Sequence, residues 1–292
     1  MTKLPVGSTI RHAYSFTFGE LGTIIGLCWL PLVLIAILQF LPYAFGGDPM
    51  AAPDNAAVQG RHGLEGLASS LLMLLLYSIA YVPVAQLALG LRKGPAMVHF
   101  ALGMPEFRLF GALLLFFLVI FVLFVGIGLL GILASGVSGL TGKNPIAGLV
   151  LALVVIAALL GFIYAMVRLG FAIVPVTVAE NQVSLTRAWL LTRGNFWRIL
   201  GTLAAVLVPL YLLHFGAIVA LVGPGLFAPL PSNPGLAEEA LASRFALVGR
   251  HIPAYLGITL ILAPFYIGLA IGAAAYAYKA LSAVKSATPS VA

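Results

Sequence analysis

Three ionisable side chains stand inside or beside long apolar segments of this chain. They are Arg168, His214 and Glu180. Arg168 lies thirteen residues before Asn181, where its apolar segment ends, which is about 20 Å of straight helix. At such depth a guanidinium can bind an anionic group, and an imidazole within a span can relay a proton. Glu180 lies near the surface at the end of its apolar segment, where a carboxylate can have a coupling role. These three residues are therefore the candidate ligand contacts.

Each of the three also has a structural interpretation. A charge within an apolar segment is costly, so Arg168 either faces a partner or bonds backbone carbonyls along its helix. For His214 we favour a hydrogen bond to a neighbouring helix over a proton relay. Glu180 either pairs with Arg187, caps the next helix, or has a coupling role.

The sequence contains none of the common catalytic or metal-binding motifs. The only cysteine is Cys28, which excludes an internal disulfide and a cysteine-based metal cluster. The chain has no glycine-rich phosphate loop and no nucleophile elbow. The remaining acidic and histidine candidates lack metal-ligand spacing: Asp48, Asp54, His62, Glu65 and His251. We expect no enzymatic activity, no cofactor and no metal.

The elements that carry these residues are membrane spans. Hydrophobic residues make up 62% of the 292 positions and charged residues only 8%, far below the usual share of a soluble domain. Apolar runs of about twenty residues are long enough to cross a bilayer. Six such runs are predicted as spans: 21–42, 66–90, 109–134, 146–178, 196–222 and 253–281.

Basic residues predict the orientation of these spans. Ten Lys and Arg residues fall on one side: Lys3, Arg11, Arg92, Lys93, Arg108, Arg187, Arg193, Arg198, Lys279 and Lys285. Four fall on the other: Arg61, Lys143, Arg244 and Arg250. Because cytoplasmic loops are enriched in Lys and Arg, both termini are expected in the cytoplasm of a bacterial cell, with the spans in its cytoplasmic (inner) membrane. The formal charge of +7 follows no nucleic-acid motif, so we expect no nucleic-acid partner.

Two loops on the opposite side are longer than the rest. Residues 43–65 are rich in Gly, Ala and Pro, which predicts an irregular connection. Residues 236–249 place apolar side chains on one face, which predicts a short amphipathic helix on the outer leaflet or against the bundle.

An internal repeat organises the chain. Residues 9–26 and 184–201 match at an offset of 175, with five of eighteen positions identical. The ends of the second, fourth and sixth spans also resemble one another in sequence. We therefore predict one integral membrane domain over residues 1–292, built from three repeats at about 6–92, 93–180 and 181–285. Each repeat is an interfacial helix followed by two spans, so the three are parallel and form an all-α bundle.

The junctions between interfacial helices and spans share a pattern. Gly19, Pro105 and Gly194 interrupt the helix, with residues 95–104 predicted as the second interfacial helix. Each is followed by a side chain expected to cap free amides: Glu20, Glu106 and Asn195. Trp189 and Trp197 are expected to anchor the interface. The three interfacial helices either anchor and reverse the chain, which we favour, or frame a cytoplasmic opening or a lipid-headgroup site.

Residues 168–201 also resemble a bacterial family. The matching positions are Arg168, Glu180, Ser184, Ala188, Trp189, Thr192, Gly194, Asn195, Phe196, Trp197 and Gly201. They are similar to the membrane domain attached to some glycerophosphodiester phosphodiesterases and to the uncharacterised YciC-type inner-membrane proteins. The resemblance implies a multi-pass membrane protein. It does not imply hydrolysis, because the barrel that carries that chemistry in those enzymes resembles nothing in this sequence.

Two functions follow from these features. The first is binding or translocation of a small solute or lipid in a cavity between the repeats, with Arg168 contacting an anionic group. The second is an accessory or structural subunit that packs against other membrane proteins or supports the cell envelope. Membrane lipids are partners in both. Polar residues around a central cavity would favour the first, and a filled axis with an exposed small-residue face would favour the second.

Overall fold

The fold is all-helical. The computed structural model describes residues 3–45, 56–92, 99–140, 145–223 and 229–286, and within these ranges all regular structure is α-helix. Six of the described helices are long and apolar enough to cross a membrane, as the sequence predicts. Their bounds are α2 (Leu21–Phe45), α3 (Ala56–Leu89), α4 (Met104–Leu140), α5 (Pro145–Glu180), α7 (Phe196–Val222) and α9 (Ile252–Ser286). The other three are α1 (Val6–Gly19), α6 (Leu185–Leu191) and α8 (Pro234–Arg250).

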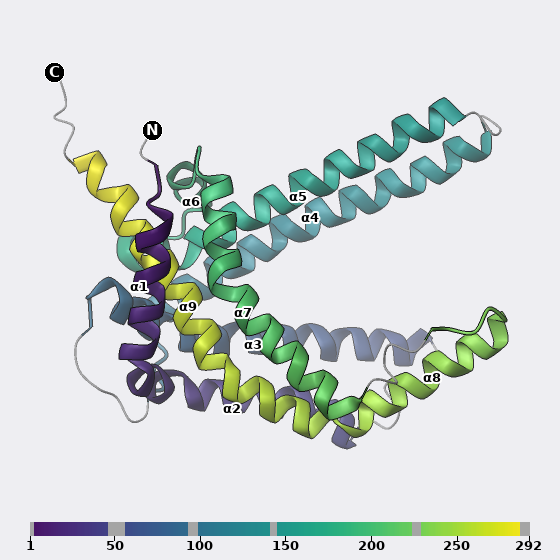
Figure 1. The fold of residues 1–292 in the computed structure, drawn as a ribbon, viewed down its shortest axis with the longest axis horizontal. Helices are drawn as coiled ribbons and strands as arrows, with labels where there is room; N and C mark the ends of the chain where they lie inside the picture. The colour runs from purple at the N-terminus through teal and green to yellow at the C-terminus, as the bar shows by residue number, and fades with distance from the viewer. Residues whose placement is uncertain (1–2, 46–55, 93–98, 141–144, 224–228, 287–292) are drawn as a thin grey trace.

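The long helices form three pairs, α2 with α3, α4 with α5, and α7 with α9. The pairs meet at one end of the molecule and diverge toward the other, most clearly between α5 and α7 (Figure 1). At the closed end α3, α5 and α9 contact one another. Each remaining long helix lies against two of these three: α2 against α3 and α9, α4 against α3 and α5, and α7 against α5 and α9.

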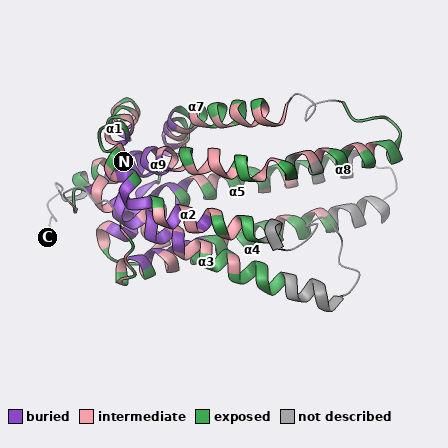
Figure 2. Cartoon of the chain, turned by 90° about the horizontal axis from the view of Figure 1, so that it is seen from below, coloured by how far each residue is buried: buried purple, intermediate pink, exposed green. Residues whose placement is uncertain are grey.

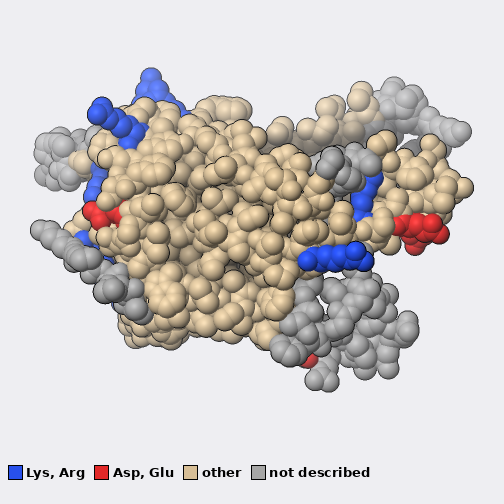
Figure 3. Space-filling view, turned by 60° about the horizontal axis from the view of Figure 1, so that its bottom comes forward, with Lys and Arg blue, Asp and Glu red and all other residues tan. Residues whose placement is uncertain are grey.

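The buried core lies at the end where the helices meet (Figure 2). Small side chains on the three inner helices are almost fully buried there, among them Ala80, Ala172 and Ala273. Small residues allow helix backbones to approach closely where lipid provides no hydrophobic driving force. The diverging halves of α4 and α5 instead expose large apolar side chains, and charged side chains lie mainly toward the two ends (Figure 3). Such a surface is that of a protein surrounded by hydrocarbon.

Helix α1 packs lengthwise along α9 and does not lie alone at an interface. A Cβ added at Gly268 would lie 2.8 Å from Thr17 Cγ2, and one at Gly272 would lie 2.8 Å from Phe16 Cδ1. These glycines therefore leave the space that α1 occupies. The close neighbours of Gly268 are on α1 and at the start of α2.

The second interfacial helix was predicted wrongly. Residues 99–103 are irregular, and residues 93–98 lie outside the described ranges. Helix α4 begins at Met104, so Pro105 sits in its first turn and does not separate two helices. A proline in the first turn costs no hydrogen bond, because the first amides of a helix have no partner within it.

Two loop predictions have different outcomes. Helix α3 begins at Ala56, so the second part of the loop predicted over 43–65 is helical, and residues 46–55 lie outside the described ranges. The amphipathic helix predicted over 236–249 is present as α8. It contacts mainly α9 and extends away from the bundle at the diverging end (Figure 1).

Candidate functional site

Arg168 is buried between α5 and α6, with 2% of its surface exposed. Its Nε donates to Thr192 Oγ1 at 3.2 Å, Nη1 donates to Tyr164 Oη at 2.8 Å, and Nη2 donates to the Trp189 carbonyl. The Trp189 ring covers the guanidinium, with 3.8 Å from Cζ to the ring centroid. These partners are all uncharged, so here the arginine bonds carbonyl and hydroxyl groups, which is the structural interpretation.

Thr192 links this contact to the repeat pattern. Its hydroxyl donates to the Ala188 carbonyl at 2.9 Å, and at the matching position Thr17 donates to the Ala13 carbonyl at 2.8 Å. All four of these residues are at most 1% exposed. Two of the five identities at an offset of 175, Ala13/Ala188 and Thr17/Thr192, are therefore buried packing positions.

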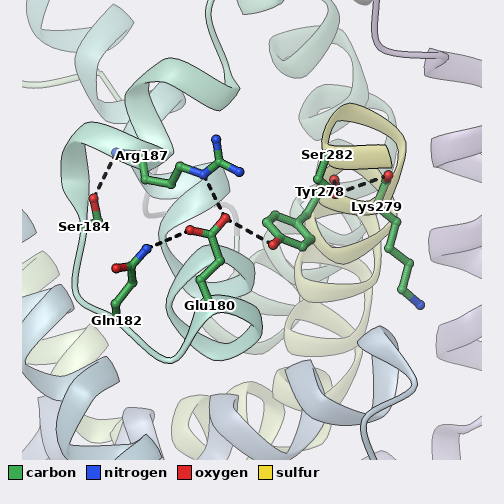
Figure 4. A network of polar contacts seen from close by, with 7 residues as sticks. All are labelled: Glu180, Gln182, Ser184, Arg187, Tyr278, Lys279 and Ser282. Atoms are coloured by element: carbon green, nitrogen blue, oxygen red, sulfur yellow. Dashed lines mark hydrogen bonds and ion pairs between the residues drawn. The ribbon is translucent and has the colours of Figure 1, made fainter. Parts of the chain in front are cut away.

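Glu180 joins three helices at the closed end (Figure 4). Its Oε1 accepts from Arg187 Nε at 2.8 Å and from Tyr278 Oη at 3.2 Å, and Oε2 accepts from Gln182 Nε2 at 2.9 Å. The pairing with Arg187 is one of the predicted alternatives. The network ties the end of α5 to α6 and α9, and it lies apart from the cavities described below.

The three predicted capping residues differ in their contacts. Glu106 Oε2 accepts from the Gly103 amide at 3.0 Å, close to the predicted role. Glu20 Oε2 accepts from the side chain of Thr23 at 3.1 Å. Asn195 occupies the N-cap position of α7 but makes no side-chain cap there. The predicted capping by Asn195 is wrong, because another donor takes its side-chain oxygen.

That donor is the amide of Leu4, 2.8 Å from Asn195 Oδ1. The Leu4 carbonyl in turn accepts from Arg198 Nη1 at 2.9 Å, and the Leu4 side chain is fully buried. Residues at the start of α7 thus hydrogen-bond both the amide and the carbonyl of Leu4, and so fix the extended segment before α1.

The two tryptophans occupy different environments. Trp197 is 78% exposed, as expected for an interfacial anchor. Trp189 is half-buried, stacks on Arg168 and meets the ring of Tyr164 edge-on with 5.6 Å between centroids. Its main contacts are therefore within the protein, and the simple interfacial role predicted for it is incomplete.

His214 on α7 contacts two side chains of α9. Its Nδ1 is 3.4 Å from Tyr266 Oη and its Nε2 is 3.5 Å from Thr259 Oγ1. The Thr259 hydroxyl already donates to the Tyr255 carbonyl at 2.9 Å, so it accepts from His214. We therefore assign the proton of neutral His214 to Nε2, and Nδ1 accepts from Tyr266. This is the contact to a neighbouring helix that we favoured from the sequence.

His214 also lines a cavity. The cavity has a volume of about 590 Å³ and lies between α5, α7 and α9, with Tyr81 of α3 at its wall. Its lining is apolar except for His214 and three tyrosines, Tyr81, Tyr211 and Tyr266. Neither Arg168 nor Glu180 lines it. The sequence analysis therefore identified one polar residue of this cavity, His214. The three tyrosines were missed, although tyrosines inside apolar segments are a signal that could have identified them.

No family model, curated protein or solved structure matches the chain. The resemblance of residues 168–201 to the phosphodiesterase membrane domain and the YciC-type proteins stays a prediction. Among the described residues, no group of three or more His, Cys, Asp or Glu side chains is placed to hold a metal ion.

A second cavity lies on the other side of α9. It has a volume of about 190 Å³ and is lined by residues of α2, α3 and α9. Its polar side chains are Gln39, Tyr77, Tyr81, Thr259 and Tyr266. Tyr81, Tyr266 and Ile267 line both cavities, so the cavities are neighbours on either side of these three residues.

Proposed function

We propose that this chain is a non-enzymatic protein of the bacterial cytoplasmic membrane that binds or translocates a small solute or lipid between its repeats. The observation that carries the proposal is the 590 Å³ cavity between α5, α7 and α9. Its volume falls within the range of about 300–1,000 Å³ typical of small-molecule sites. Its lining is likewise typical, being apolar with a few polar groups.

The three-repeat organisation is part of this proposal. In its support, the matched positions on α1 and α6 have the same burial and the same hydroxyl-to-carbonyl hydrogen bond. The contacts of the six long helices also follow a cyclic pattern, with each outer helix between two inner ones. In this scheme the cavity lies between the second repeat, which supplies α5, and the third, which supplies α7 and α9.

The orientation is supported by the helix directions. The described chain begins and ends at the closed end of the bundle (Figure 1). Most of the basic residues counted above belong to the helix ends and short helices of that end. One of them, Lys279, donates to the Ala88 carbonyl at 3.0 Å and so stabilises the last turn of α3. A cytoplasmic closed end agrees with the excess of Lys and Arg there.

Membrane lipids are the most accessible occupants of the cavity. Every residue that lines it belongs to a candidate span. Because α5 and α7 diverge away from the closed end, the region between them borders hydrocarbon when the protein is in a bilayer (Figure 1). A hydrophobic or amphiphilic molecule can then enter from the side.

Two neighbouring residues of α7 provide the test. Leu207 lines the cavity, whereas Val208 is 47% exposed at the same depth. Native mass spectrometry of protein purified in mild detergent from its host membrane should detect a bound lipid. Leu207→Trp should remove that species by filling the cavity, and Val208→Trp should retain it. Equal retention by both variants would contradict the proposal.

The accessory-subunit alternative has its own supporting observation. Gly126 and Gly128 of α4 and Gly161 of α5 have no heavy atom within 4 Å of an added Cβ, and the large side chains around them are exposed. Such a small-residue face can receive a helix of another membrane protein. If this is the function, Gly128→Leu should abolish co-purification of a partner, while Leu207→Trp should not.

A further inference from the structure

The two cavities together hold polar groups that lack partners. Within the described residues, the Tyr81 hydroxyl makes no hydrogen bond, and the Gln39 amide has only a contact of 3.9 Å from Nε2 to Met73 Sδ. Tyr81 belongs to α3 and Gln39 to α2, both candidate spans. An unpaired hydroxyl or amide carbonyl surrounded by hydrocarbon costs free energy, so each of these groups gains from a hydrogen bond to an occupant.

The two cavities differ in character. The larger one is lined almost entirely by apolar side chains and suits a hydrocarbon chain. The smaller one has five polar side chains among its twelve lining residues and is only about 190 Å³. Since Tyr81 and Tyr266 line both, an elongated molecule that passes them has its apolar part on one side and a compact polar end on the other.

The charges around the cavities limit which head groups the ligand can have. No Asp, Glu, Lys or Arg lines either cavity in the described structure. The anion contact predicted from the sequence, Arg168, already binds Tyr164, Thr192 and Trp189. A phosphate or carboxylate in this site would therefore lose its hydration without gaining a counter-charge, which is strongly unfavourable.

The directions of the hydrogen bonds favour a ligand hydroxyl group. Tyr266 donates its proton to His214 Nδ1, which leaves the Tyr266 oxygen free to accept from a ligand hydroxyl. The Tyr81 hydroxyl can donate to a ligand oxygen, and the Gln39 carbonyl can accept. A ligand hydroxyl can accept from Tyr81 and donate its one proton to either the Gln39 carbonyl or the Tyr266 oxygen.

We propose that the two cavities form one binding site for an uncharged amphiphile. Its hydrocarbon chain occupies the cavity between α5, α7 and α9, and its hydroxyl head occupies the cavity beside Gln39. This inference rests on the proposed function and specifies its ligand class. It also removes the anionic ligand that the sequence suggested through Arg168.

Four probes of equal chain length test the ligand class: hexadecane, hexadecan-1-ol, hexadecanoate and hexadecyl phosphate. Binding is measured by competition with a fluorescent long-chain alcohol on the full-length protein in nanodiscs. Hexadecan-1-ol should bind at least about tenfold more tightly than hexadecyl phosphate, because the phosphate remains charged in an uncharged site. Tighter binding of the phosphate or of the carboxylate would overturn the inference.

Side-chain variants test the position of the head group. Tyr81→Phe and Gln39→Leu should each weaken hexadecan-1-ol binding about fivefold, the value of one hydrogen bond, and leave hexadecane binding unchanged. Tyr276→Phe, on α9 and outside both cavities, is the matched control and should change neither. If Tyr81→Phe and Gln39→Leu weaken neither probe, the head group does not bind there and the inference fails.

Leu207→Trp separates this inference from the proposed function. It should weaken hexadecane and hexadecan-1-ol alike, because it fills the space for the chain. If it weakens neither, the proposed function fails together with the inference. If it weakens both while the head-group variants have no effect, the cavity binds a chain and only the assigned head-group position is wrong.

Discussion

The guanidinium of Arg168 stacks on the ring of Trp189, with 3.8 Å between its Cζ and the ring centroid. The same arginine donates to the Trp189 carbonyl, so both the ring and the backbone of one residue hold it. A cation over an aromatic face gains more when both are removed from water. Because Arg168 lies on α5 and Trp189 on α6, this pair attaches the short helix α6 to the bundle.

Arg168→Leu should destabilise the protein without reducing ligand binding. The substitution removes the hydrogen bonds from the guanidinium to Thr192 Oγ1 and to the Trp189 carbonyl, and a hydrogen bond from a charged donor is worth about 1.5–3 kcal/mol. A lower thermal unfolding temperature in nanodiscs is the measurement, with the exposed Arg193→Leu as control. Unchanged stability combined with lost hexadecan-1-ol binding would instead indicate a direct ligand contact.

Gly268→Ala should destabilise the contact between α1 and α9. The added Cβ would lie 2.8 Å from Thr17 Cγ2 and 3.1 Å from Ile24 Cδ1, which forces α1 away at a cost of about 1–3 kcal/mol. Gly257→Ala on the same helix has no atom within 4 Å, so it should be neutral or slightly stabilising. Thermal unfolding of the two variants compares them directly, and equal unfolding temperatures would refute the close approach.

Asn195→Leu should release the segment before α1. The side chain can no longer accept from the Leu4 amide, although Arg198 still binds the Leu4 carbonyl. We expect hydrogen exchange at the Leu4 amide to rise by about tenfold or more, with little change at Ile199, a buried residue of α7. An unchanged exchange rate at Leu4 would mean that another acceptor holds this amide.

The orientation predicts which substituted cysteines react from outside the cell. In a Cys28→Ser background, a cysteine replacing exposed Arg193 should be protected from an impermeant maleimide in intact cells. A cysteine replacing Leu236, which is 53% exposed on α8, should be labelled. The opposite pattern would reverse the assigned topology.

The sequence predicted the spans well because their signal is local. Long apolar runs define them regardless of packing, and all six predicted spans end within two residues of the corresponding helix window. The early start of α3 was missed because residues 56–65 lack an apolar run, although they are helical.

The contacts that shape the site were not local and escaped prediction. Asn195 had the chemistry of a helix cap, but its acceptor binds Leu4, 191 residues away in the chain. Arg168 had the chemistry of a ligand contact, but the return of the chain through α6 supplies its partners. The cavity depends on how α5 and α7 diverge, and no single segment encodes that angle.

The most direct test of the central claim is a cryo-EM map of the protein in nanodiscs formed from its host lipids. The account predicts elongated density between α5, α7 and α9 that reaches Tyr81 and Tyr266, and loss of that density in Leu207→Trp. A map in which α5 and α7 close together and their side chains fill this space would contradict it.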